Sequence, residues 1–197
     1  MKVPEIERRE EVPVGAEETA LLVVHMQRDF VSADGSLFVP DAPKTVAPIS
    51  DLLGQARAAG ALVVFTQDWH LEDDPEFSLW GPHAVGGSSG AEIVEELSPQ
   101  AGEPRIHTPT YDTFFGTPMD HILRRKAMKQ VVLVGTMANV CVLHAAGSAA
   151  LRGYGVVWVE DGVSALSEFD MAVALRQATF LYGASVTKAS GVRFRGS

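Results

Sequence analysis

The chain has 197 residues, 46% hydrophobic and 21% charged, which is typical of a folded domain with a sizeable core. Its net charge of −9 and the lack of a basic run longer than Arg124–Lys126 argue against binding to nucleic acid. No apolar stretch reaches the roughly 18 residues of a membrane span, the N-terminus lacks the apolar core of a signal peptide, and the single cysteine, Cys141, excludes an internal disulfide. We therefore expect a cytoplasmic protein that binds neither membranes nor nucleic acid.

Short apolar runs alternate with helical patterns along the whole chain. The runs are continuous rather than alternating, which is typical of strands buried on both faces. The predicted strands are Thr19–His25, Ala61–Thr66, Arg105–His107, Val131–Gly135, Val156–Glu160 and Ser185–Lys188. The main predicted helices are Thr45–Ala59, Asn139–Leu151 and Ser167–Tyr182, with a further helix starting near Thr117.

This alternation predicts an α/β fold: a parallel sheet with helices on both faces. Ligands of such sheets bind beyond the carboxyl ends of the strands. We expect residues 1–18 to form an N-terminal arm and residues 19–197 a single domain. The long loop 68–90 is rich in Gly, Pro and Ser, and a loop of this length is often functional.

The first strand ends in polar side chains, within the stretch ALLVVHMQRDF. His25 can act as a general base near neutral pH, or can simply be a hydrogen-bonded residue at a strand end. Asp29 is expected to be a structural hydrogen-bond acceptor in the turn before Gly35.

The second strand ends in VVFTQDWH, where Asp68 and His70 point the same way in an extended chain. His83 lies in the loop beyond. One carboxylate and two imidazoles suit zinc or a similar divalent ion, with positions left for water. The alternative is that these are ordinary polar loop residues.

The fourth strand continues as VVLVGTMANVCV, which places Cys141 in the first turn of a helix. Free N–H groups and the helix dipole favour a thiolate there. The alternative is that Cys141 is a small buried apolar residue of the core. His144, three residues on, is expected to serve packing or an interface rather than proton transfer.

Taken together, the segments ALLVVHMQRDF, VVFTQDWH, WGPHAVGGSSGAE, YDTFFGT and VVLVGTMANVCV resemble the isochorismatase-like cysteine hydrolases, which include nicotinamidases, N-carbamoylsarcosine amidases and ureidoacrylate amidases. The resemblance extends from Thr19 to about Lys188. It implies a three-layer fold with a six-stranded parallel sheet of order 3-2-1-4-5-6, flanked by helices.

The resemblance also implies roles for individual residues. Cys141 corresponds to the nucleophile, and the bond Met137–Ala138 to a cis peptide that turns the Ala138 N–H into an oxyanion hole beside the Cys141 N–H. The implied metal ligands are Asp68, His70 and His83, with zinc as the expected ion. Glu76 lies near a position where some relatives have another histidine. The implied substrate-binding residues are Phe30, Trp80, Thr108, Tyr111 and Phe114.

Two positions depart from the family pattern. His25 stands where the family has its catalytic aspartate, and Thr108 where it has a lysine. His25 can replace both residues if it forms a thiolate–imidazolium pair with Cys141. A lysine beside an imidazole would only lower its basicity, so the joint replacement is consistent with a rewired site. It is equally consistent with loss of activity.

We therefore expect a cysteine-dependent hydrolase of a small amide or ureide C–N bond. The alternatives are a non-catalytic homologue that binds a small molecule, and, less favoured, a vinyl-ether hydrolase of the isochorismate type. Because relatives commonly assemble as dimers or tetramers, we also expect a homo-oligomer. The stretches AAGSAALRGYG and ATFLYG are candidate contact surfaces, although both also resemble ordinary core.

Overall fold

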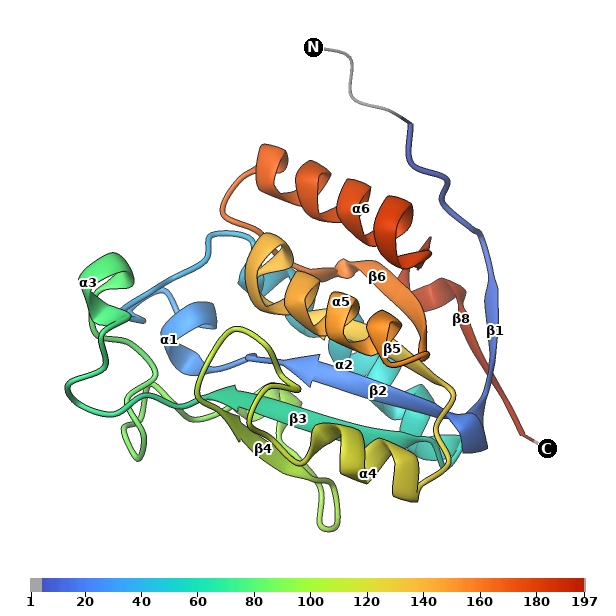
Figure 1. Cartoon of the computed structure of the whole chain (residues 1–197), viewed down its shortest axis with the longest axis horizontal. Coiled ribbons are helices and arrows are strands. Elements are labelled where there is room, and N and C mark those ends of the chain that lie inside the picture. Colours follow the sequence, from blue (N-terminus) through green and yellow to red (C-terminus); the bar gives the residue numbers. More distant parts are fainter. Residues whose placement is uncertain (1–4, 197) are drawn as a thin grey trace.

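A central sheet of six parallel strands organises the computed structural model, which describes residues 5–196 (Figure 1). Its order is β4-β3-β2-β5-β6-β7. The strands are β2 (Thr19–Val24), β3 (Leu62–Asp68), β4 (Arg105–Thr108), β5 (Gln130–Gly135), β6 (Gly155–Val163) and β7 (Ser185–Thr187). Counted from β2, this is the predicted order 3-2-1-4-5-6, so the fold prediction is confirmed.

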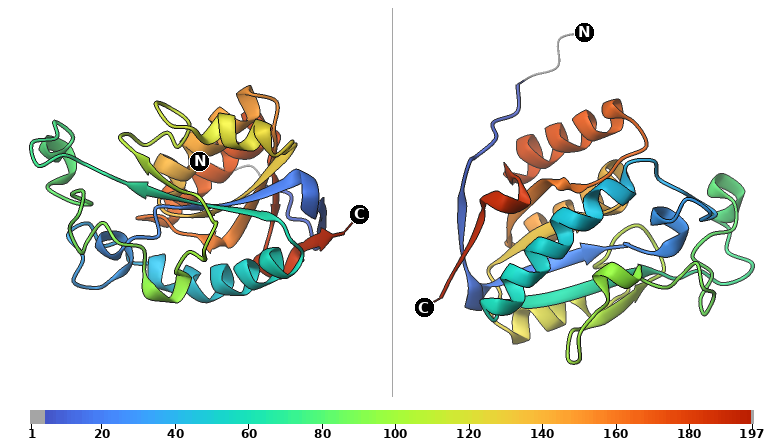
Figure 2. Two further views of the ribbon diagram at one scale, coloured as in Figure 1. Left: turned by 90° about the horizontal axis from the view of Figure 1, so that it is seen from below. Right: turned by 180° about the vertical axis from the view of Figure 1, so that it is seen from behind.

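Helices cover both faces of the sheet, as Figure 2 shows from below and behind. The long helix α2 (Ala42–Ala58) packs on one face, and α4 (Met119–Arg125), α5 (Leu143–Leu151) and α6 (Glu168–Tyr182) pack on the other. The buried residues accordingly form two clusters, one on each face. Every residue of β2 is buried, which explains its continuous apolar sequence.

Local sequence signals account for the helix ends. At the start of α6, the Ser167 hydroxyl accepts a hydrogen bond from the Asp170 N–H. At its end, Gly183 adopts the left-handed conformation with φ +63°. The helix predicted from Asn139 differs at its start, because residues Ala138–Val142 form a π-helical turn, η3, before α5 begins. Such turns often occur at functional sites.

A small second sheet pairs a strand near the N-terminus with a strand near the C-terminus. Strand β1 (Val12–Gly15), within the predicted arm, pairs in parallel with β8 (Val192–Arg195), and Arg8 forms an ion pair with Glu160 at 2.7 Å. The arm therefore lies against the domain from Arg8 onward. Residues 1–4 of the arm and Ser197 lie outside the described residues.

Short helical segments complete the fold. The single-turn helices α1 (Arg28–Val31) and α3 (Phe77–Trp80) lie beyond the carboxyl ends of β2 and β3. The 3₁₀ turns are η1 (Ala16–Glu18), η2 (Glu95–Leu97) and η4 (Ala189–Gly191). Within residues 5–196, no helix has the length and apolar character needed to cross a bilayer.

Asp29 holds the long loop 68–90 onto α1. Its carboxylate accepts hydrogen bonds from the backbone N–H of Ala84 at 2.8 Å and of Ser36 at 3.2 Å. Burial alone would raise the pKa of Asp29, but these bonds outweigh it and lower the pKa. A side chain at Gly90 would collide with this carboxylate, because a Cβ there would lie 2.2 Å from it. Asp29 thus acts as the structural acceptor expected from the sequence.

Candidate active site

The carboxyl ends of four adjacent strands deliver the candidate residues to one edge of the sheet. His25 follows β2, Asp68 ends β3, Thr108 ends β4, and η3 with Cys141 follows β5. Gly135 allows this arrangement, because a Cβ at that position would lie 1.9 Å from the Val24 carbonyl oxygen of β2. Any larger residue would therefore push apart the two strands that carry His25 and Cys141.

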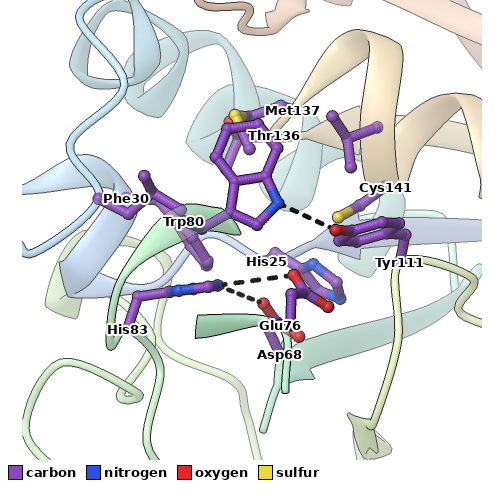
Figure 3. A pocket seen from close by; sticks show the side chains of 12 residues that line it. His25, Phe30, Asp68, Glu76, Trp80, His83, Tyr111, Thr136, Met137 and Cys141 are labelled. Carbon is purple, nitrogen blue, oxygen red and sulfur yellow. Dashed lines mark hydrogen bonds and ion pairs between the residues drawn. The ribbon is translucent and has the colours of Figure 1, made fainter. Parts of the chain in front are cut away.

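These strand ends and the loops above them enclose a single pocket, seen in Figure 3. In that view His25 lies below Cys141 and Tyr111, with Asp68, Glu76 and His83 on the lower side. Trp80 Nε1 donates to the Tyr111 hydroxyl at 2.9 Å, so two loops meet in the pocket wall. The lining residues are His25, Phe30, Leu37, Asp68, Glu76, Trp80, His83, Tyr111, Thr136, Met137, Val140 and Cys141.

His25 is a buried imidazole with one bonded and one free nitrogen. Its backbone lies in the left-handed region, with φ +51°, which histidine tolerates better than most residues. Nε2 is 2.9 Å from the Thr108 hydroxyl, whereas Nδ1 is buried without a hydrogen-bond partner among the described residues. Burial lowers the pKa of His25 to about 4, despite the opposing charge of Asp68. His25 is therefore neutral at physiological pH.

Cys141 is a buried thiol next to two backbone donors. Burial and the negative charge of Asp68 raise its pKa well above the usual range. The backbone N–H groups of Met137 and Cys141 lower the pKa of the thiol, because both are placed to donate to Sγ, but they do not outweigh burial. These shifts favour a thiol and a neutral imidazole over the thiolate–imidazolium pair considered from the sequence, and among the described residues no hydrogen bond from the thiol reaches Nδ1.

The oxyanion-hole assignment requires a correction of one residue. The non-proline cis peptide bond is Thr136–Met137, not Met137–Ala138. The Ala138 N–H donates to the Ser164 carbonyl at 2.8 Å and is therefore already occupied. The Met137 N–H, which directly follows the cis bond, is instead placed to donate to Cys141 Sγ. The resemblance located the cis bond only within the segment VVLVGTMANVCV, where no proline marks which of two neighbouring bonds is cis.

Two residues expected in the substrate pocket do not line it. Thr108 is fully buried, and its hydroxyl contacts His25 and the Gln67 carbonyl. Phe114 packs in the core on the α5 side of the sheet, with the Arg152 guanidinium over its ring at 5.0 Å. Phe30, Trp80 and Tyr111 do line the pocket. A loop aromatic can pack inward or toward a cleft, and sequence alone does not distinguish the two.

Asp68, His70 and His83 form a buried cluster that could hold a metal ion. Their potential ligand atoms all lie within 4.8 Å of one another. The Asp68 carboxylate is 3.1 Å from His70 Nε2 and 3.5 Å from His83 Nε2. Burial alone would raise the pKa of Asp68, but the bonds from the two histidines hold it well below its usual range. The clustering expected from the sequence is therefore present.

The orientation of these side chains fits a divalent cation. His83 Nδ1 donates to the Gly81 carbonyl at 2.8 Å, so the lone pair of a neutral His83 lies on Nε2, facing Asp68 and Glu76. His70 Nδ1 is 3.0 Å from the Asp74 carboxylate, which orients the ring so that Nε2 faces Asp68. Asp68 Oδ1 is buried and has no partner among the described residues. Lone pairs that converge in this way favour a positive ion.

Asp74 and Glu76 extend this cluster beyond the predicted ligands. Glu76 lies 4.0 Å from His83 Nε2, and its pKa is raised by burial and by the charge of Asp68. The sequence offers one signal for Asp74, which is its position four residues after His70 at the start of a short helical turn.

Metal addition should stabilise the protein through this cluster. With Zn²⁺ at about 100 times its dissociation constant, linkage predicts roughly 2.7 kcal/mol of additional stability and a higher Tm. Asp68→Asn should lose most of this increase, because it removes the carboxylate shared by both histidines. Asp51→Asn, at an exposed position of α2, is the matched control. Equal Tm responses in both variants, measured by scanning calorimetry, would show that zinc binds elsewhere.

Comparison with known proteins gives matches over most of the chain. The model of the Isochorismatase domain matches residues 19–190. The ureidoacrylate amidohydrolase RutB of Stutzerimonas stutzeri (strain A1501) is 30% identical over an alignment of 203 positions, and the match covers 89% of this chain and 82% of the relative. The matched region contains every strand end that lines the pocket.

Solved structures show the same fold. The N-carbamoylsarcosine amidase from Thermoplasma acidophilum is 37% identical with a TM-score of 0.80, and the match covers 87% of this chain and 96% of that one. The pyrazinamidase of Pyrococcus horikoshii, solved in complex with zinc, is 30% identical with a TM-score of 0.82, covering 87% of this chain and 99% of that one.

Proposed function

Because the chain belongs to the isochorismatase family, we propose that it is a cysteine hydrolase that cleaves the C–N bond of a small amide or ureide. The relatives named above are amidases and amidohydrolases. The observation that carries the proposal is the position of Cys141, in a closed pocket with the N–H groups of Met137 and Cys141 at its sulfur and the free nitrogen of His25 in the same pocket.

In the first step the Cys141 thiol attacks the substrate carbonyl. The thiol proton passes to His25 Nδ1 as the S–C bond forms, and the carbonyl π electrons move onto oxygen. The N–H groups of Met137 and Cys141 then stabilise the oxyanion, and each such donor is typically worth about 3 kcal/mol of barrier. Proton transfer accompanies attack because neither group ionises on its own at neutral pH.

The second half of the reaction restores the enzyme. The imidazolium proton moves to the leaving nitrogen, the C–N bond breaks, and an amine departs from a thioester on Cys141. A water molecule, deprotonated by His25 Nδ1, then attacks the thioester, and the sulfur leaves and recovers its proton. The net reaction is amide plus water giving acid plus amine.

A divalent ion, proposed to be zinc, would be held by Asp68, His70 and His83 beside this pair. Once bound, it would supply positive charge and a site for polarising the substrate or water. Glu76 is the nearest additional carboxylate on the same side of the pocket. The cytoplasmic location remains a proposal, based on the single cysteine.

The charge of the pocket predicts its substrate preference. Its lining, drawn from residues 5–196, contains the carboxylates of Asp68 and Glu76 but neither lysine nor arginine. A substrate carboxylate would therefore lack an ionic partner from the protein. In a hydrolysis panel, we expect neutral amides such as nicotinamide to be cleaved with kcat/KM at least about tenfold above that of anionic ureido acids such as ureidoacrylate. The opposite order would contradict this interpretation of the pocket.

A non-catalytic binding protein is the alternative, and one observation favours it. The thiol has a raised pKa and is not hydrogen-bonded to the imidazole nitrogen that would receive its proton. Catalytic hydrogen bonds are, however, often absent until substrate binds. Turnover of any amide in the panel that is abolished by Cys141→Ser would eliminate this alternative. Saturable binding without turnover would establish it.

We also propose a homo-oligomer. Of the two candidate stretches, the first is largely core, since Ala145, Ala146 and Ala149 are fully buried. The second places Phe180 and Leu181 on the surface, 65% and 58% exposed. Burying these side chains between subunits would remove apolar surface from water. Light scattering should give a mass that is a multiple of 21.1 kDa. A mass equal to one chain would contradict the proposal.

A further inference from the structure

Thr108 lies where it can control the protonation of His25. It ends β4 and is paired in register with Asp68 at the end of β3. Its hydroxyl is completely buried and makes two contacts, to His25 Nε2 at 2.9 Å and to the Gln67 carbonyl oxygen at 3.1 Å. Since Thr108 is absent from the pocket lining, these contacts, rather than a substrate, account for its position.

The direction of both hydrogen bonds follows from the Gln67 carbonyl. A carbonyl oxygen can only accept, so the 3.1 Å contact is a hydrogen bond only when the Thr108 hydroxyl donates its single proton to Gln67. This carbonyl belongs to β3, within the sheet, and cannot rotate away. The Thr108 oxygen is then left as an acceptor toward His25 Nε2. A neutral imidazole carries one proton, so the proton lies on Nε2 and the lone pair on Nδ1.

From this arrangement we propose that Thr108 is a positioning residue that holds His25 in the Nε2–H tautomer, so that Nδ1 is the basic nitrogen for Cys141. The inference rests on the proposed function, in which His25 receives the thiol proton. An imidazole in the other tautomer would present an N–H at Nδ1 and could not accept a proton there. The Gln67 carbonyl, Thr108 and His25 thus form one ordered series of donors and acceptors, which leaves His25 Nδ1 free to accept the proton of Cys141.

This series of hydrogen bonds gives a physical reason why positions 25 and 108 both differ from the family pattern. A histidine has two nitrogens and needs a partner that selects between them, whereas a carboxylate does not. A lysine can only donate, so it could not accept from Nε2–H. Threonine supplies one donor and one acceptor in a buried space at the end of a strand. The two replacements therefore act together in a rewired site.

The test compares Thr108→Val, which keeps the side-chain shape but removes the hydroxyl, with Thr108→Ser, which keeps the hydroxyl. Thr108→Ala is the second hydroxyl-free variant if the valine variant does not fold. The first readout is the ¹⁵N spectrum of histidine-labelled protein, with the His25 signals assigned by their loss in His25→Asn. The second is kcat and KM for the best neutral amide of the panel.

We expect wild type and Thr108→Ser to carry the proton on Nε2, and the hydroxyl-free variants to show a mixture of tautomers or the Nδ1–H form. We expect kcat to fall about 10- to 1,000-fold in the hydroxyl-free variants and by less than about threefold in Thr108→Ser, with KM little changed in both. A merely structural role for Thr108 would not change the tautomer in a folded variant.

Two results would overturn the proposal: an Nδ1–H tautomer in the wild type, or a hydroxyl-free variant with the wild-type tautomer and a kcat within about twofold of wild type. Failure of the proposed function has a different signature. In that case no amide is turned over, although the tautomer still follows the Thr108 hydroxyl. If turnover depends on Cys141 but is indifferent to the Thr108 hydroxyl, the function stands and this inference fails.

Discussion

Replacing Cys141 with serine should lower kcat/KM for the best amide substrate by about 10⁴-fold or more. The substitution exchanges one atom and keeps the geometry of the pocket, but an aliphatic hydroxyl is a far weaker nucleophile than a thiol of the same site. His25 Nδ1 would have to remove a much less acidic proton. The measurement is steady-state hydrolysis, followed by release of the amine or ammonia.

The control for this variant is its folding. The serine hydroxyl remains beside the N–H groups of Met137 and Cys141, which offer it hydrogen bonds. We therefore expect a Tm close to that of the wild type and an unchanged response to Zn²⁺. A variant that folds, binds zinc and retains more than about a tenth of wild-type activity would rule out Cys141 as the nucleophile.

Replacing His25 with asparagine should lower kcat about 10²- to 10⁴-fold, the usual range for a general base. Asparagine tolerates the left-handed backbone at this position, where φ is +51°, but has no basic nitrogen. His144→Asn is the matched control, because His144 is exposed and its Nδ1 contacts the Val140 carbonyl at 2.7 Å. Loss of activity in His144→Asn, or wild-type activity in His25→Asn, would contradict the assignment of His25 as the general base.

The pKa of His25 predicts how the activity of the wild type depends on pH. Burial lowers the pKa of His25 to about 4, so the base is fully neutral above about pH 5 and becomes protonated below it. For wild type, kcat/KM should therefore fall as the pH drops through about 4, not through the ordinary histidine value near 6.5. The residual activity of His25→Asn should lack this acidic decline. The same depressed pKa means that protonation of His25 opposes folding, so its contribution to stability is present above pH 6.5 and is lost as the pH falls toward 4.

The centre of the sheet was predictable from sequence because its strands are buried on both faces. Continuous apolar runs locate β2, β3 and β5, and the polar residues at the ends of β2 and β3 point to His25, Asp68 and His70. Strands β1 and β8 were missed, since only alternate residues of β1 are buried and Val192 is the only buried residue of β8. Such edge segments resemble loops in sequence.

The details of the site were less predictable, because they depend on backbone irregularity and burial. The Ala138 N–H, expected to face the cleft, is bonded to the Ser164 carbonyl, and the cis bond precedes Met137 without a proline to mark it in the sequence. Thr108 has an ordinary polar side chain, and only the strand register brings it to His25. The protonation of the Cys141–His25 pair depends on desolvation, which the local sequence around either residue does not report.

In the proposed mechanism His25 removes the thiol proton while Cys141 attacks the substrate. Rapid quenching of the wild type with its best neutral amide, followed by intact-mass spectrometry, measures the rate at which an acyl group appears on Cys141. We expect a thioester on that residue, formed at least about 100-fold more slowly in His25→Asn and at the wild-type rate in His144→Asn. Acylation at the wild-type rate in His25→Asn, or turnover without any adduct on Cys141, would contradict it.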